Sequence, residues 1–154
     1  MTRRSTTITI CTDGRKKRSR VKLLADTGAL LALFNPRDAL HQRAKKFTRE
    51  AAGTRFVLTE LILSETVTRL RARTDAARAA DVGAALLNSR RYEVLFVDPP
   101  LVEAGIADLR RFADKRLSLV DAVSFAVIRA LALDGSFTFD RDFRDCGFDV
   151  YPRP

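Results

Sequence analysis

Short apolar runs alternate along this chain with longer stretches in which apolar residues recur every three or four positions. The short runs predict buried strands; they lie at residues 21–25, 55–58, 92–97, 137–139 and 149–151. The longer stretches predict helices, at residues 27–34, 38–52, 60–73, 75–88, 101–114 and 119–133. Strands that alternate with helices favour parallel pairing through right-handed crossovers. We therefore expect an α/β fold with a central parallel sheet of four or five strands and helices on both faces.

Length and composition fit one ordinary globular domain. The chain has 154 residues, of which 46% are hydrophobic, which suffices for a single sizeable core. No apolar run approaches the ~18 residues of a membrane span. Cys11 and Cys146 form no paired motif, so we expect a cytoplasmic protein. The single histidine, His41, excludes an acid–base mechanism that uses two histidines and argues against a zinc site.

The positive charge is concentrated at the start of the chain. Residues 1–22 carry eight Lys or Arg and one acid, whereas the remaining 132 residues carry 20 Lys or Arg and 18 acids. We therefore divide the chain into a basic, flexible arm at residues 1–20 and a domain at residues 21–154. The arm would attract nucleic acid non-specifically, or it is a solvated tail with no such role.

Four carboxylates occupy positions where the predicted fold would bring them together. Asp26 and Asp140 follow predicted strands, and the carboxyl ends of parallel strands form the ligand-binding edge of such sheets. Asp121 lies on the apolar face of its helix, and Glu65 lies at the edge of another apolar stripe. Two carboxylates ~5 Å apart repel by roughly 3 kcal/mol at an effective dielectric of ~20. Such a cluster predicts neutralisation by a bound cation, and carboxylate oxygens favour Mg²⁺ or Mn²⁺.

Each of these acids also has a purely structural interpretation. Asp26 and Asp140 could cap helices, and Asp121 could form a capping box with Ser118. Glu65 could form an ordinary surface pair with Arg69, four residues later. The joint occurrence of all four acids favours the metal-site interpretation over these separate alternatives.

The order of four short motifs resembles that of the PIN-domain ribonuclease family, and within it the VapC-type toxins of type II toxin–antitoxin systems. The motifs are LLADTGALLALF, LTELILSETVTRL, LSLVDAVSFAVI and FTFDRDF. The resemblance as a whole covers about residues 21–151, nearly all of the chain outside the arm. The resemblance implies a single PIN-like domain. It also implies four catalytic and metal-binding acids, namely Asp26, Glu65, Asp121 and Asp140, with Asp142, Thr27 and Thr138 as auxiliary residues.

The resemblance further implies a Mg²⁺- or Mn²⁺-dependent endoribonuclease that acts as the toxin of a bacterial pair. Its partners would be an RNA substrate, a cognate antitoxin and a second copy of the chain in a homodimer. No association with a membrane is expected. RNA must approach an acidic site, so basic residues are expected around its rim. The candidates before Asp121 are Arg110, Arg111, Lys115 and Arg116, and Arg69, Arg71 and Arg73 extend from the helix of Glu65. These basic residues could equally form a solvated helix face.

Two other function classes remain open at this point. A phosphate-accepting or Mg²⁺-binding signalling module also gathers acids at strand ends. Such modules normally have adjacent acids after the first strand and a late lysine, whereas Asp26 stands between Ala25 and Thr27 and no lysine follows Lys115. A PIN-type nuclease that processes RNA or DNA without being a toxin is the other alternative.

Overall fold

A single five-stranded parallel sheet organises the chain, as the sequence predicted. The computed structural model describes residues 21–153, so the predicted arm at residues 1–20 lies outside it. The strand order is β3-β2-β1-β4-β5, and every neighbouring pair is parallel. The strands are β1 (Lys22–Ala25), β2 (Arg55–Thr59), β3 (Tyr92–Leu95), β4 (Ser136–Phe137) and β5 (Val150–Tyr151).

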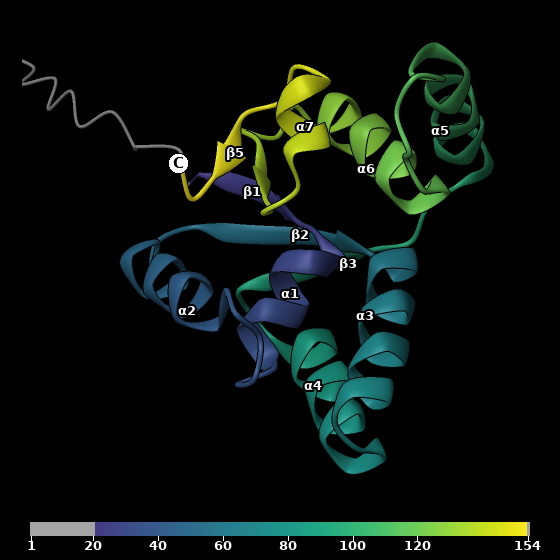
Figure 1. Ribbon diagram of the computed structural model, residues 1–154. Helices are drawn as coiled ribbons and strands as arrows, with labels where there is room; N and C mark the ends of the chain where they lie inside the picture. The colour runs from purple at the N-terminus through teal and green to yellow at the C-terminus, as the bar shows by residue number, and fades with distance from the viewer. Residues whose placement is uncertain (1–20, 154) are drawn as a thin grey trace, which may run out of the picture.

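Seven helices among the described residues cover both faces of this sheet (Figure 1). On one side lie α1 (Thr27–Phe34), α2 (His41–Glu50), α3 (Glu60–Arg73) and α4 (Ala76–Asn88). On the other lie α5 (Pro99–Arg111), α6 (Leu119–Ala130) and α7 (Arg141–Asp145). The chain moves outward from β1 to β3 and then returns to β4, so right-handed crossovers place the later helices on the opposite face. None of the helices in residues 21–153 has the length and apolarity to cross a membrane.

Side-chain caps fix the point at which most helices begin. Asp26, Thr59, Asp75, Asp98 and Ser118 each accept a hydrogen bond from a backbone N–H in the first turn of the following helix. These bonds satisfy donors that the helix itself leaves unpaired. Asp26 directly follows β1 and Thr59 is the last residue of β2, so α1 and α3 start immediately at the carboxyl ends of these strands.

The contact between α5 and α6 is unusually close. A Cβ atom at Gly105 would lie 2.6 Å from Val123 Cγ2, so only glycine allows α5 to approach α6 this nearly. One turn further along, the buried side chain of Asp108 pairs with Arg129 of α6. Packing and an ion pair therefore hold these two helices together.

The structure differs from the sequence prediction at several element ends and in one added helix. The strands β3 and β4 end two residues before the predicted positions, and α5 and α6 each end three residues before theirs. The second helix begins at His41, not at residue 38, because Asn35 and Asp38 accept hydrogen bonds from the N–H groups of Arg37 and Leu40 and form turns. The short helix α7 was not predicted, since five residues are too few to show a helical period.

Candidate active site

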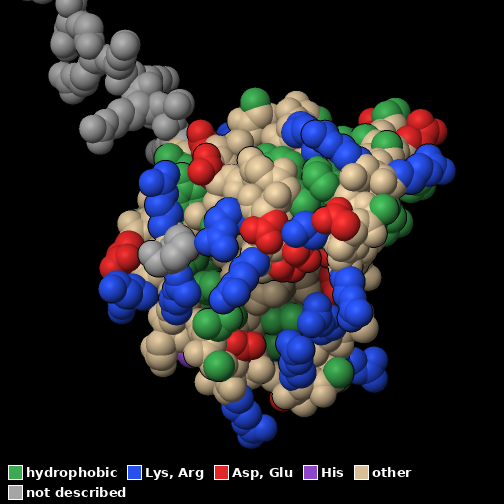
Figure 2. Space-filling view, turned by 45° about the horizontal axis from the view of Figure 1, so that its top comes forward, with side chains coloured by type: hydrophobic (Ala, Val, Ile, Leu, Met, Phe, Trp, Pro, Cys, Tyr) green, Lys and Arg blue, Asp and Glu red, His purple; other side chains and the backbone are tan. Residues whose placement is uncertain are grey.

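The strand order runs from β1 outward to β3 on one side and continues with β4 and β5 on the other. This change of direction places the start of α1 beside the end of β4. β1 pairs with β4 in the register Leu24 to Ser136 and Ala25 to Phe137. The next residue, Asp26, donates its backbone N–H to the Phe137 carbonyl at 3.0 Å. Strand ends at such a switch point form the crevice where open α/β sheets bind ligands. The crevice opens on the face shown in Figure 2, where acidic side chains gather at the centre and Lys and Arg side chains surround them.

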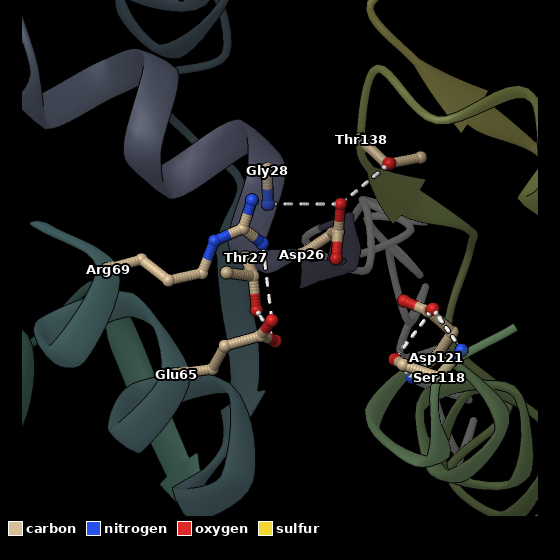
Figure 3. Close-up of polar contacts among 8 residues, drawn as sticks. All are labelled: Asp26, Thr27, Gly28, Glu65, Arg69, Ser118, Asp121 and Thr138. Atoms are coloured by element: carbon tan, nitrogen blue, oxygen red, sulfur yellow. Dashed lines mark hydrogen bonds and ion pairs between the residues drawn. The ribbon is translucent and has the colours of Figure 1, made fainter.

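All four predicted acids line one pocket of about 410 Å³ in this crevice. Asp26 comes from the end of β1, Glu65 from α3, Asp121 from α6 and Asp140 from the loop before α7. In Figure 3 the carboxylates of Asp26, Glu65 and Asp121 point toward a common space. The structure thus brings together residues that are up to 114 positions apart in the chain.

Asp26 is the most buried of these acids, with 6% of its surface exposed. Its Oδ2 accepts hydrogen bonds from Thr138 Oγ1 at 2.9 Å and from the Gly28 N–H at 3.3 Å. Burial, followed by the charges of Asp121 and Asp140, raises the pKa of Asp26 to about 7, although the Thr138 bond opposes the shift. The pocket therefore holds more negative charge than its own hydrogen bonds stabilise.

Asp121 and Asp140 are held at helix starts. Asp121 Oδ2 accepts hydrogen bonds from the N–H and the hydroxyl of Ser118, which completes a capping box on α6. Burial raises the pKa of Asp121, as do the nearby charges of Asp140 and Glu65, while the Ser118 bonds lower it. Asp140 Oδ1 accepts from the Asp142 N–H and so caps α7. The capping roles considered from the sequence are therefore present together with the cluster.

Glu65 differs from the three aspartates because protein donors reach both of its oxygens. Thr27 Oγ1 donates to Oε2 at 2.9 Å, and Arg69 Nη1 donates to Oε1 at 3.2 Å (Figure 3). The surface pair with Arg69 that the sequence allowed is thus formed. Thr27 is buried, and its hydroxyl links the first turn of α1 to α3.

One oxygen of each aspartate is left without a protein donor in residues 21–153. These atoms are Oδ1 of Asp26, Oδ1 of Asp121 and Oδ2 of Asp140. Three open carboxylate oxygens in one pocket are the hard donors that Mg²⁺ prefers. In the described part of the chain, however, no three His, Cys, Asp or Glu side chains converge closely enough to form a metal site as they stand. The site fits a divalent cation in donor chemistry and charge, and binding would require these side chains to move closer together.

The basic residues at the pocket are only partly those that the sequence suggested. Arg69 and Arg73 of α3 line it. Arg71 and the four candidates before Asp121 do not: Arg110 and Arg111 end α5, Lys115 pairs with Asp145 at 3.5 Å, and Arg116 is exposed. Their role in RNA binding stays a prediction, as does the auxiliary role of Asp142, which lies in α7 outside the lining of the pocket.

A second set of arginines adjoins the acids and was missed in the sequence. Arg43, Arg141 and Arg144 line a pocket of about 270 Å³ that also contains Asp140. Arg141 and Arg144 follow Asp140 directly, which is a local signal, but Arg43 lies almost 100 residues earlier. The only histidine, His41, has its Nδ1 2.8 Å from the Ala32 carbonyl oxygen and takes no part in the acid pocket.

Comparison with known proteins supports the resemblance seen in the sequence. Residues 23–149 match the PIN domain family. A curated relative from Mycobacterium tuberculosis, named 23S rRNA-specific endonuclease VapC20, is 37% identical over 133 residues, which cover 86% of this chain and 98% of the relative. A crystal structure of VapC20, described as a sarcin–ricin loop cleaving toxin, superposes with a TM-score of 0.77 at 31% identity and covers 82% of this chain and 96% of that chain.

A more distant solved structure agrees in fold alone. It is a toxin–antitoxin complex from Klebsiella pneumoniae with a TM-score of 0.58 at 18% identity, and it covers 79% of this chain and 88% of that chain. The family match spans most of the described residues and includes all four acids of the pocket. The chain belongs to the PIN-domain family and, within it, to the VapC-type proteins.

Proposed function

We propose that this protein is an endoribonuclease toxin that hydrolyses a phosphodiester bond with the help of Mg²⁺ or Mn²⁺. The observation that carries the proposal is the trio of Asp26, Asp121 and Asp140. Each has one oxygen held by a protein donor and the other open to a shared pocket. Hydrogen bonds thus orient the carboxylates without occupying them, and the raised pKa of Asp26 indicates a site that a divalent cation would stabilise.

The relatives support a more specific form of this proposal. Because VapC20 is named as a 23S rRNA-specific endonuclease, we infer that the substrate is a structured ribosomal RNA loop. The toxin–antitoxin complex with the same fold supports an antitoxin partner, and we place the activity of this protein in the cytoplasm. A homodimer remains part of the proposal.

The chain's own residues divide the work by position. Asp26, Asp121 and Asp140 would hold the cation through their open oxygens. A bound Mg²⁺ supplies Lewis-acid chemistry, lowering the pKa of a water and offsetting the charge of the phosphate. Thr138 and Ser118 keep the Asp26 and Asp121 carboxylates oriented. In the absence of the cation, Asp26 would hold a proton near neutral pH.

Glu65 and Arg69 would act at the side of the pocket formed by α3. Thr27 and Arg69 fix the carboxylate of Glu65, so its orientation is set before substrate arrives. The Arg69 guanidinium lies beside the pocket and can approach a phosphate oxygen once RNA is bound. Direct ligation of a cation by Glu65 stays a prediction.

Cleavage of RNA by the purified full-length protein tests this function. The substrates are a stem-loop that carries the sarcin–ricin sequence of 23S rRNA and a pool of mixed single-stranded RNA, each with Mg²⁺, with Mn²⁺ or with EDTA. We expect cleavage that requires the cation and falls about 10³-fold in Asp121→Asn, equal to ~4 kcal/mol of barrier.

Asp81→Asn is the matched control, because Asp81 is exposed on α4 and outside the pocket. It removes the same charge and should cleave as the unmodified protein does. Undiminished cleavage by a folded Asp121→Asn variant, or full cleavage in EDTA, would refute the proposed site. Cleavage of many RNAs at similar rates would favour a non-toxin processing nuclease.

A further inference from the structure

The pocket lined by Arg43, Arg141 and Arg144 shares a wall with the acid pocket. Leu40, Phe139 and Asp140 line both. The arginines come from α2 and α7, and Arg69 and Arg73 of α3 lie on the acid pocket itself. An RNA strand that lies across the acid pocket and passes over Asp140 would therefore contact Arg43, Arg141 and Arg144.

The three arginines have little of their charge neutralised within residues 21–153. Within residues 21–153 Arg141 forms no ion pair, and the one ion pair of Arg144 there is with Asp145 at 4.0 Å. Arg43 Nη2 donates to the Arg153 carbonyl at 3.2 Å, and no carboxylate of residues 21–153 pairs with it. By contrast, Arg91, which directly precedes β3, donates to three backbone carbonyls at and just after the end of α2. Guanidinium groups gathered in this way repel one another unless an anion joins them.

The geometry also indicates which part of an RNA would enter. The Arg43 guanidinium carbon lies 5.5 Å from the centre of the Phe139 ring and covers it. That ring face is therefore closed to a stacking base. What remains is a polar pocket with forked donors, which match the oxygens of a phosphate.

We propose that the arginine pocket binds a backbone phosphate of the RNA beside the phosphate held at the acids. The proposal rests on the ribonuclease function inferred above. One phosphate at the acids and a neighbouring one at the arginines would fix the direction of the strand across the site, and hence which bond lies over the carboxylates. The pocket thus acts in positioning and contributes no reacting group.

Binding of RNA as a function of salt tests the proposal. In full-length protein made inactive by Asp121→Asn, Arg43, Arg141 and Arg144 are changed together to Gln. Glutamine keeps much of the side-chain stem and removes the charge. The probe is the fluorescently labelled sarcin–ricin stem-loop. Each phosphate contact to a single strand contributes about 0.7 to the slope of log K against log salt. Because the proposal places one phosphate in the pocket, we expect the slope to fall by about 0.7 and the affinity at low salt to fall at least tenfold.

Lys22, Arg55 and Arg90 changed together to Gln provide the matched control. These three side chains are exposed at or just before the first residues of β1, β2 and β3. They therefore lie at the amino ends of the strands, opposite the carboxyl ends that form the acid pocket. This triple variant removes the same charge and should change the slope by much less. Thermal unfolding of both variants checks that each is folded.

Cleavage kinetics separate this proposal from the proposed function. In otherwise active protein the pocket variant should raise KM at least tenfold and leave kcat within a few-fold. If the unmodified protein cleaves RNA but the two triple variants weaken binding equally, the arginine pocket has no special role. If the pocket variant keeps its affinity for RNA but loses binding of a glutamate-rich peptide, the pocket is a protein-binding site and the proposal is wrong. If the unmodified protein neither binds nor cleaves RNA, the proposed function fails and this inference fails with it.

Discussion

Two aspartates are buried in this protein to almost the same extent and have opposite surroundings. Asp26, at the end of β1, is 6% exposed, and Asp108, in α5, is 4% exposed. Asp108 pairs with Arg129 across the α5–α6 contact, whereas Asp26 faces Asp121 and Asp140. A buried carboxylate that is paired with a cation is explained by structure. One that is placed among other carboxylates indicates a ligand. Burial alone does not distinguish the two.

The largest expected difference between these aspartates is in how stability depends on pH. In metal-free protein the pKa of Asp26 is about 7, raised from 3.8. The folded state therefore binds more protons than the unfolded state between about pH 4 and pH 7, and stability falls as pH rises through this window. The full effect of Asp26 is up to about 4 kcal/mol, of which roughly 2–3 kcal/mol falls between pH 5 and pH 8.

Urea unfolding in EDTA at pH 5 and pH 8 measures this dependence, with Asp26→Asn as the reference that lacks the titrating group. We expect the variant to be more stable than the unmodified protein at pH 8, and the difference to shrink at pH 5. Added Mg²⁺ should stabilise the unmodified protein and have little effect on the variant. If Asp26→Asn were less stable than the unmodified protein at pH 8, burial and the neighbouring carboxylates would not destabilise the charged form of Asp26.

The same substitution at the other buried aspartate should have the opposite sign. Asp108→Asn removes the partner of Arg129 and leaves a cation at the α5–α6 contact. Because the Arg129 side chain is 41% exposed, water compensates part of the loss, and we expect a destabilisation of about 1–2 kcal/mol. Urea unfolding at pH 7 measures it. RNA cleavage per folded molecule should be unchanged, and a large loss of cleavage would mean that this contact also supports the site.

Glu65 should show the smallest effect among the pocket acids. Its oxygens already accept from Thr27 and Arg69, so we expect Glu65→Gln to reduce cleavage about tenfold, or ~1.4 kcal/mol. The Glu65–Arg69 pair is partly exposed, so stability should change by less than about 1 kcal/mol. Arg69→Gln is the companion variant, which keeps Glu65 and removes its cation. If Glu65→Gln lost as much cleavage activity as Asp121→Asn, Glu65 would instead belong among the direct metal ligands.

The sequence predicted the acids of the site better than its basic residues, for a physical reason. Strand ends and helix caps are local patterns, so Asp26, Asp121 and Asp140 could be placed before the sheet order was known. Their meeting depended on β1 and β4 being neighbours, which the sequence left open and the structure confirms. The arginine pocket joins α2 to α7, which are about 100 residues apart, and no periodicity links them.

The ion pair of Asp108 and Arg129 was missed for a related reason. Each residue looked ordinary on its own helix, and only the close approach at Gly105 brings the two helices into contact. The helix α7 also escaped prediction because its five residues are fixed by one cap, Asp140, and by the buried ring of Phe143.

Asp26, Asp121 and Asp140 each hold the first turn of a helix with one oxygen and face the pocket with the other. Asparagine caps helices about as well as aspartate but does not provide the negative charge. A single Asp→Asn replacement at one of these positions should therefore yield a folded but inactive copy that still presents the same outer surface. Such a copy would compete with the active protein for any partner that recognises this surface. Loss of cleavage activity would therefore not entail loss of partner binding.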